Sequence, residues 1–295
     1  MAHLLIQMLV KLKNFNSFIV LSTGAMLIGF APIFVKWSSL SPAWILFYRM
    51  FLALPMLLML NLILNKTIIF KFKSSKSLYM SALASMGFTI DLIIWHWSMN
   101  ITSVSNATII VNSAPIFVAI LAYIFYNEQI KSKFLLSFLI TYGGIVGLIY
   151  YSNSYEAGKL HGDLAVIIAA ISYAIYLLIL SRLGDEDPFV VIFYTTLFCC
   201  LYSIPIGLVE SGIQVPPNTF DWLNFFLLAF LCQFGGQFLI TIGIGNISNS
   251  MGAIGLLMQP ITATILAAYF FNEFLNIMQI IFIFIALFGI YLAKT

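Results

Sequence analysis

Two ionisable side chains that could do chemistry, Arg49 and Asp91, lie inside long apolar stretches of this 295-residue chain. Each lies about seven residues, or about 10 Å, from the same predicted membrane surface. A buried guanidinium can hold a carboxylate or a phosphate, and a buried carboxylate can hold an amine or exchange a proton. Charges are costly in lipid, so both are candidates for substrate binding or coupling. The alternative is a static ion pair that locks two helices together.

Polar and aromatic side chains at helical spacing extend this candidate site. Asp91 and Trp95 are four residues apart and share a helix face, so the Trp95 ring could stack on a substrate. The further candidates for substrate contact or coupling are Asn112, Gln237, Gln259, Tyr48 and Tyr194. Tyr173 and Tyr176 could add to an aromatic lining. Anchoring at the lipid interface and helix packing are the alternative roles for these rings.

A proline followed thirteen residues later by a glutamate occurs twice, 145 positions apart. The first pair is Pro115 and Glu128, and the second is Pro260 and Glu273. The pairs that match around them are Ser103 and Ser248, Ala122 and Ala267, Phe125 and Phe270, Asn127 and Asn272, and Gly144 and Gly289. The chain therefore looks like a duplicated unit. Proline removes a backbone donor and kinks a helix, so we predict kinks at Pro115 and Pro260.

The composition excludes a water-soluble globular protein. Hydrophobic residues make up 62% of the chain and charged residues 8%, with a mean hydropathy of +1.06. That leaves too little polar surface to cover an apolar core in water. Apolar runs long enough to cross about 30 Å of hydrocarbon predict ten membrane-spanning helices. They cover approximately 18–36, 42–64, 76–98, 103–126, 132–151, 161–182, 188–210, 220–242, 248–271 and 276–293.

Ten spans divide into five per copy, and an odd number of crossings turns the second copy upside down. We therefore predict an all-α integral membrane protein with ten transmembrane helices in two inverted five-helix repeats. An N-terminal cytoplasmic segment (1–17) precedes the first repeat (18–151) and the second repeat (161–293). Inverted duplication is typical of secondary transporters, whose substrate sites lie near the bilayer midplane.

The basic residues predict the orientation. Of the 13 Lys and Arg residues, ten fall on one predicted side of the membrane, two on the other, and Arg49 within a span. Basic residues collect on the cytoplasmic side, so both termini should face the cytoplasm. We predict a multi-pass protein of the bacterial inner (plasma) membrane. The acidic run 185–187 is interpreted as a solvated loop between two spans.

Two stretches carry a resemblance to a known family: SLSPAWILFYRMFLALP (39–55) and DLIIWHWSMNITSVSNATIIVNSAPIF (91–117). Together with the repeated proline-to-glutamate spacing, they resemble the EamA-type ten-helix transporters of the drug/metabolite transporter superfamily. The resemblance implies eight helices around a central cavity, alternating access and small metabolites as cargo. It also implies that the spans 132–151 and 276–293 lie at the periphery. The second copy departs from the first, because Thr195 and Gln237 stand near the positions that correspond to Arg49 and Asp91. The charged side chains of the cavity should therefore come from the first half only.

We predict a secondary transporter that moves a small organic metabolite across the inner membrane by alternating access, with export favoured over import. The substrate classes are amino acids or their derivatives, nucleosides, cofactor precursors and amphipathic compounds. Proton coupling, facilitated diffusion and exchange are left open, as is the oligomeric state. We expect membrane lipid as a partner and no catalytic residue, metal, cofactor or nucleic acid. The alternative is an integral-membrane enzyme acting on a lipid-linked substrate, although the spans contain no paired carboxylates and no His-rich metal pattern.

Overall fold

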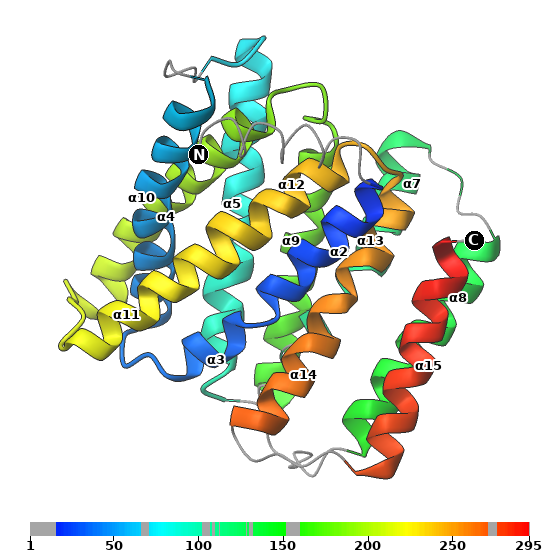
Figure 1. The fold of residues 1–295 in the computed structure, drawn as a ribbon. Helices are drawn as coiled ribbons and strands as arrows, with labels where there is room; N and C mark the ends of the chain where they lie inside the picture. The colour runs from blue at the N-terminus through cyan, green and yellow to red at the C-terminus, as the bar shows by residue number, and fades with distance from the viewer. Residues whose placement is uncertain are drawn as a thin grey trace.

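The structure, a computed structural model, describes residues 16–65, 71–101, 107, 110–111, 113–127, 129, 132–151, 160–270 and 276–294. Within these ranges every regular element is a helix, and the helices form one bundle (Figure 1). In the first half they are α2 (Ser17–Ile28), α3 (Ala31–Lys36), α4 (Pro42–Asn65), α5 (Ser75–Ser98), α7 (Ala114–Tyr126) and α8 (Ser132–Tyr150). In the second half they are α9 (Leu160–Ser181), α10 (Pro188–Ser211), α11 (Thr219–Leu227), the π-helix η1 (Leu228–Gln237), α12 (Phe238–Ile244), α13 (Asn249–Leu256), α14 (Met258–Phe270) and α15 (Ile277–Lys294).

Six helical stretches in the described part of the chain are long and apolar enough to cross a membrane. They are Ser17–Lys36, Pro42–Ile63, Ser75–Ser98, Leu164–Ser181, Pro188–Ser211 and Thr219–Ile244. Shorter apolar helices cover Ile116–Tyr126, Ile254–Ala267 and Ile277–Ala286. The prediction of a multi-span, all-helical membrane protein is therefore confirmed. The count of ten spans stays a prediction, because the predicted span 103–126 lies partly outside the described residues.

Several of these helices are interrupted within their apolar length. Helix α2 ends at Ile28, and α3 begins two residues after Gly29 with Pro32 in its first turn. A similar break separates α13 from α14 at Leu257. Helices α11, η1 and α12 are continuous, but η1 has the wider winding of a π-helix over ten residues. Irregular backbone in lipid is tolerated only where protein or a water-filled cavity satisfies it, so these breaks mark the interior of the bundle.

The main helix contacts join the two halves of the chain. Helix α5 packs on α9, α4 packs on α10, and α2 packs on η1 and α12. Helices α8 and α15 pack on each other along one edge of the bundle, as the green and red ribbons in Figure 1 show. The two halves are therefore packed extensively against each other.

Glycines allow α8 and α15 to approach closely. A methyl group on Gly144 would lie 2.7 Å from the amide nitrogen of Ala286, and one on Gly289 would lie 2.7 Å from that of Thr141. Such distances are too short for a side chain, so both positions require glycine. Because the earlier residue on α8 meets the later residue on α15, the two helices run antiparallel.

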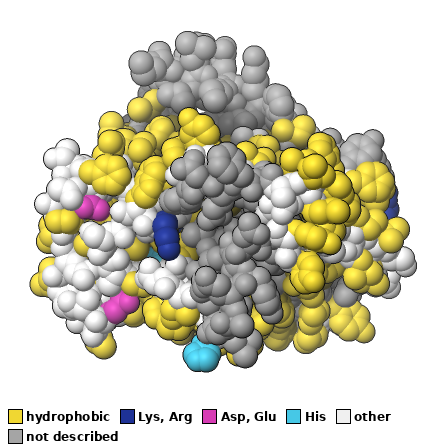
Figure 2. Space-filling view, turned by 90° about the horizontal axis from the view of Figure 1, so that it is seen from below, with side chains coloured by type: hydrophobic (Ala, Val, Ile, Leu, Met, Phe, Trp, Pro, Cys, Tyr) yellow, Lys and Arg dark blue, Asp and Glu magenta, His cyan; other side chains and the backbone are white. Residues whose placement is uncertain are grey.

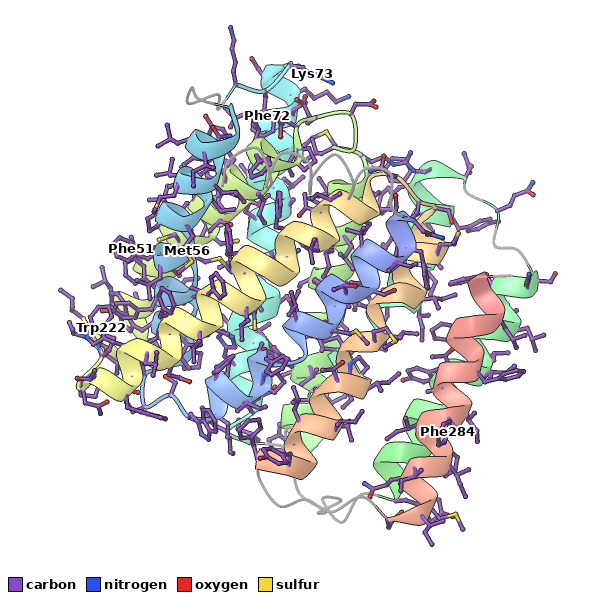
Figure 3. The ribbon with its side chains drawn as sticks, viewed as in Figure 1. Phe51, Met56, Phe72, Lys73, Trp222 and Phe284 are labelled. Carbon is purple, nitrogen blue, oxygen red and sulfur yellow. The ribbon has the colours of Figure 1, made fainter. Side chains whose placement is uncertain are left out.

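Large apolar side chains cover the outside of the bundle. Phe51 on α4 and Phe284 on α15 are 50% and 66% exposed, and they lie on opposite sides in Figure 3. In the view from below, Figure 2 shows hydrophobic side chains over the upper left and the right of the molecule, with few charged ones among them. An apolar surface of this extent fits lipid as the surrounding solvent.

Candidate functional site

A narrow cavity lies where helices of the two halves meet. Its polar lining consists of Arg49, Asp91, Trp95, Tyr173, Gln237 and Gln259. Five of these six side chains are predicted substrate contacts and Tyr173 is a predicted part of the aromatic lining; the structure brings them together from α4, α5, α9, η1 and α14. The free volume is only about 30 Å³, which is room for roughly two water molecules. The space around the polar groups is therefore narrow.

Arg49 and Asp91 enter the cavity from the neighbouring helices α4 and α5, and their exposed fractions are 1% and 4%. Arg49 Nε, Arg49 Nη1 and Asp91 Oδ1 have no hydrogen-bonding partner among the described residues. The two charges act on each other through space. Buried charges without hydrogen bonds are costly. These atoms are consequently available to water or to a ligand.

Trp95 and Gln237 carry further unpaired atoms in the same cavity. Trp95 lies one helical turn after Asp91, and its Nε1 donor is buried without an acceptor in the described part of the chain. Gln237 Nε2 donates to the Tyr176 hydroxyl at 2.7 Å, while Gln237 Oε1 has no donor there. Gln237 closes the π-helix η1, and π-helical turns are frequent at functional sites. The cavity thus presents both a free donor and a free acceptor besides its two charges.

Three stacked rings form an aromatic wall beside the charges. The Phe88 ring lies 4.4 Å from that of Tyr176 and 6.1 Å from that of Tyr173, measured between centroids. Arg49 Cζ lies 6.0 Å from the centre of the Phe88 ring, within reach of a cation–π attraction. Phe88 and Leu92 also line the cavity, although neither is among the residues predicted from the sequence. Their spacing from Asp91 and Trp95 along one helix face is the signal that could have found them.

Two predicted side chains, Tyr48 and Tyr194, are not among the described residues that line this cavity. Tyr48 directly precedes Arg49, so its side chain is rotated by about 100° around the helix axis. Its hydroxyl donates to the carbonyl of Gln214 at 3.0 Å. The Tyr194 ring packs on Phe72, with 5.0 Å between centroids. Asn112 lies outside the described residues. Tyr48 and Tyr194 therefore contact residues of the segments that follow α10 and precede α5.

The two repeated prolines each begin a helical segment. Pro115 lies in the first turn of α7, which starts at Ala114. Pro260 lies in the first turn of α14, after the break at Leu257. Proline suits a first turn because the missing N–H would have no partner there. The glutamates of the repeated pairs, Glu128 and Glu273, lie outside the described residues.

Ring contacts join the halves at opposite ends of the bundle. At the lower end in Figure 1, Trp37 after α3 meets Phe270 of α14 edge to face, with 5.4 Å between centroids. At the upper end, the guanidinium of Arg182 lies over the ring of Tyr126, the last residue of α7, with Cζ 3.7 Å from its centroid. The cavity lies between these two contacts.

The acidic loop before α10 is not simply solvated, which corrects the sequence interpretation of the run 185–187. Glu186 is only 9% exposed. Its Oε2 accepts from the backbone N–H of Lys73 at 3.1 Å, and its Oε1 accepts from the Ser77 hydroxyl at 2.5 Å. Lys73 Nζ also donates to the Asp185 carbonyl. Glu186 thereby ties the loop to the start of α5, near the labelled Lys73 in Figure 3.

Polar bonds also join α4 and α10 at the other end. The backbone N–H of Ala43 donates to Glu210 Oε2 at 3.1 Å, and Trp44 Nε1 donates to the Gly212 carbonyl at 2.7 Å. A carboxylate at the start of α4 is favoured by the helix dipole. Helix α4 is therefore held to α10 close to the outer end of the bundle in the predicted orientation.

The described residues offer no site for a metal ion. Within them, no group of three His, Cys, Asp or Glu side chains could hold a metal ion. Cys199, Cys200 and Cys232 are free and buried. The cavity therefore offers charge, hydrogen bonds and aromatic faces as its means of recognition.

The family model of the EamA-like transporter family matches the chain twice, over residues 16–150 and 160–295. An uncharacterized transporter of Archaeoglobus fulgidus is 24% identical over 272 residues, which cover 89% of this chain and 92% of that protein. An S-adenosylmethionine uptake transporter of Rickettsia bellii is 26% identical over 61% of this chain and 60% of that protein. Mouse solute carrier family 35 member G1 is 28% identical over 62% of this chain and 52% of that protein.

A solved crystal structure has the same fold. It superimposes with a TM-score of 0.76 and covers 94% of this chain and 96% of that chain, at 13% sequence identity. At this identity the likeness concerns the fold alone. The two matches of the family model and the fold agree with the resemblance to EamA-type transporters seen in the sequence.

Proposed function

The chain belongs to the EamA-like transporter family, and from this premise we propose that it is a secondary transporter whose substrate site is the cavity around Arg49 and Asp91. It is a multi-span helical membrane protein and a transporter of small metabolites rather than an enzyme, as the family and the names of its relatives indicate. The alternative of an enzyme acting on a lipid-linked substrate is therefore set aside. S-adenosylmethionine, the cargo named for the rickettsial relative, is one candidate substrate.

We propose that the two family repeats form inverted halves of five spans each, with repeat boundaries at 18–151 and 161–293. Equivalent contacts support this arrangement. Gly144 and Gly289 are 145 positions apart, and each packs against the helix that carries the other. The positions they meet, Thr141 and Ala286, are also 145 apart. Two antiparallel helices that exchange equivalent contacts are related by a twofold axis across them, which is what inversion in a membrane requires.

The observation that carries the proposal is the narrow cavity with two buried, unpaired charges. Its volume is too small for a metabolite, and ring contacts join the halves on both sides of it. We infer alternating access from this geometry, with a narrowed site whose two ends open one at a time. Movement of one half against the other would open the cavity to one side.

We propose that the end carrying Lys73 and Arg182 faces the cytoplasm, together with both termini, in the bacterial inner membrane. Basic residues favour that side. Thiol labelling provides a test, because Lys133→Cys at the start of α8 and His161→Cys at the start of α9 are exposed positions. An impermeant maleimide should label His161→Cys from outside intact cells and Lys133→Cys only after permeabilisation. The reverse pattern would overturn the orientation.

Export and proton coupling through Asp91 stay predictions. The rickettsial relatives are named for uptake, so family membership supports no direction. Unequal solute flux with and without a pH gradient across the same vesicles would support proton coupling, whereas equal flux would exclude it.

The test of transport is reconstitution of the purified protein into liposomes loaded with a small-molecule extract of bacterial cells. Mass spectrometry of the outside solution should detect solutes that leave only when the protein is present, without ATP. Protein-free liposomes report passive leakage. If no solute crosses faster with the protein than without it, in either direction, the proposed function fails.

A further inference from the structure

The cavity holds unpaired groups of both signs. Arg49 supplies a buried cation with two free donor atoms, and Trp95 Nε1 adds a neutral donor. Asp91 Oδ1 is a free anionic acceptor, and Gln237 Oε1 is a neutral one. All four side chains line the same space and are at most 4% exposed. Donors and acceptors therefore come in two sets, each consisting of one charged and one uncharged group.

The charge of a ligand decides how many of these groups are satisfied. An anion would pair with Arg49 and leave Asp91 buried without a partner. A cation would pair with Asp91 and leave Arg49 buried without a partner. A neutral molecule would satisfy neither charge, and an unpaired buried charge weakens binding strongly. Only a ligand with both charges supplies partners to both sets.

We propose that this cavity selects small zwitterions, with a carboxylate held by Arg49 and Trp95 and a protonated amine held by Asp91 and Gln237. A guanidinium pairs well with a carboxylate because it offers parallel donors. The inference rests on the proposed transport function and names its substrate class.

The apolar part of the ligand has a defined place as well. Phe88 and Leu92 lie on the helix face that carries Asp91, and Val111 lines the space next to them. The Phe88 ring is already stacked on Tyr176, so it presents a fixed flat surface. A side chain with an aromatic or aliphatic group fits against this wall, whereas a bare sugar would leave it uncovered.

The liposome experiment with bacterial extract tests the inference directly. The solutes released in a protein-dependent way should be zwitterions, enriched about tenfold or more over anions, cations and neutral solutes of similar size, since one missing charged hydrogen bond changes affinity by that much. Release of mainly singly charged or neutral solutes would overturn the inference and leave the transport function standing. Release of none would overturn both.

Variants then separate the two ends of the ligand. Asp91→Asn should reduce release of zwitterions about tenfold while release of carboxylates without an amine persists or rises. Arg49→Gln should have the reverse preference and favour amines without a carboxylate. Asp187→Asn removes a carboxylate from an exposed loop position that asparagine can also cap, so its release profile should match the wild type. If the release of zwitterions falls in both variants, but neither variant changes its preference between carboxylates and amines, the assignment is overturned.

Trp95→Phe keeps the ring and removes only the Nε1 donor, which guards against variants that fail to fold. It should reduce release of carboxylate-containing solutes several-fold and leave amines without a carboxylate unaffected. Equal reduction of both groups would contradict the role given to Trp95.

Discussion

The guanidinium of Arg182 lies over the ring of Tyr126, with Cζ 3.7 Å from its centre, and joins the ends of α9 and α7. Trp37 stands 145 positions before Arg182 and packs on Phe270 at the opposite end of the bundle. Phe270 in turn stands 145 positions after Phe125, the neighbour of Tyr126. Nearly equivalent positions thus make a contact between the halves at each end. Alternating access requires that one contact opens while the other stays closed.

Removal of a ring from one end should expose the cavity to that side only. We expect Tyr126→Ala and Phe270→Ala to increase maleimide labelling of a Leu92→Cys reporter, about 2- to 5-fold each, as loss of a ring contact worth about 0.5–1 kcal/mol predicts. The two variants should act from opposite sides of the membrane. The three native cysteines are replaced by alanine in this background.

Each of these variants is the control for the other, because both remove one aromatic ring but at opposite ends of the bundle. Reagent added outside and inside oriented vesicles provides the measurement. An increase from the same side in both variants would contradict a gate at each end.

Adjacent glycines of α8 offer a matched pair for stability. Gly144→Ala should destabilise the protein by about 1–3 kcal/mol, because its methyl group would lie 2.7 Å from the amide nitrogen of Ala286. Gly143→Ala meets no atom within 4 Å and should be neutral or stabilising by up to about 1 kcal/mol, as alanine favours helix. Thermal unfolding in detergent compares the two. Equal melting temperatures would show that α8 and α15 are not tightly packed in solution.

Much of the site could be predicted from the sequence because charge in lipid is rare. Arg49 and Asp91 stood out by their cost alone, and Trp95 followed from helical spacing. Helix bounds were also close, since apolar length is fixed by the membrane: the predicted span 76–98 compares with Ser75–Ser98. These signals are local, so one chain is enough to read them.

The rest depends on contacts between distant segments. Nothing local distinguishes Tyr48, which bonds the Gln214 carbonyl, from Tyr173, which lines the cavity. Likewise Glu186 resembles its acidic neighbours in sequence but bonds residues more than 100 positions away. Side-chain spacing also does not predict whether a segment such as η1 winds as an α-helix or as a π-helix. Tertiary packing decides such features.

Glu186 should stabilise the protein by tying its loop to the start of α5. Glu186→Ala leaves the Lys73 N–H and the Ser77 hydroxyl without their acceptor, so we expect a loss of about 1–3 kcal/mol. Glu186→Gln keeps one acceptor and should lose less. Thermal unfolding measures both, with exposed Asp185→Asn as the control, since only the backbone carbonyl of Asp185 is bonded. A melting temperature unchanged in Glu186→Ala would mean that the loop is not tied to α5.

Arg49 and Asp91 should reduce stability in the empty protein, because their unpaired atoms are buried. Replacing both charges by apolar groups, as in Arg49→Met with Asp91→Leu, should therefore stabilise the protein by about 1–4 kcal/mol and abolish transport. Arg49→Met alone leaves Asp91 buried without its opposite charge and should destabilise. Thermal unfolding of the ligand-free protein distinguishes the interpretations. A double variant less stable than the wild type would identify the pair as a static lock between α4 and α5, whereas a more stable one would mean that the two charges are kept for the ligand.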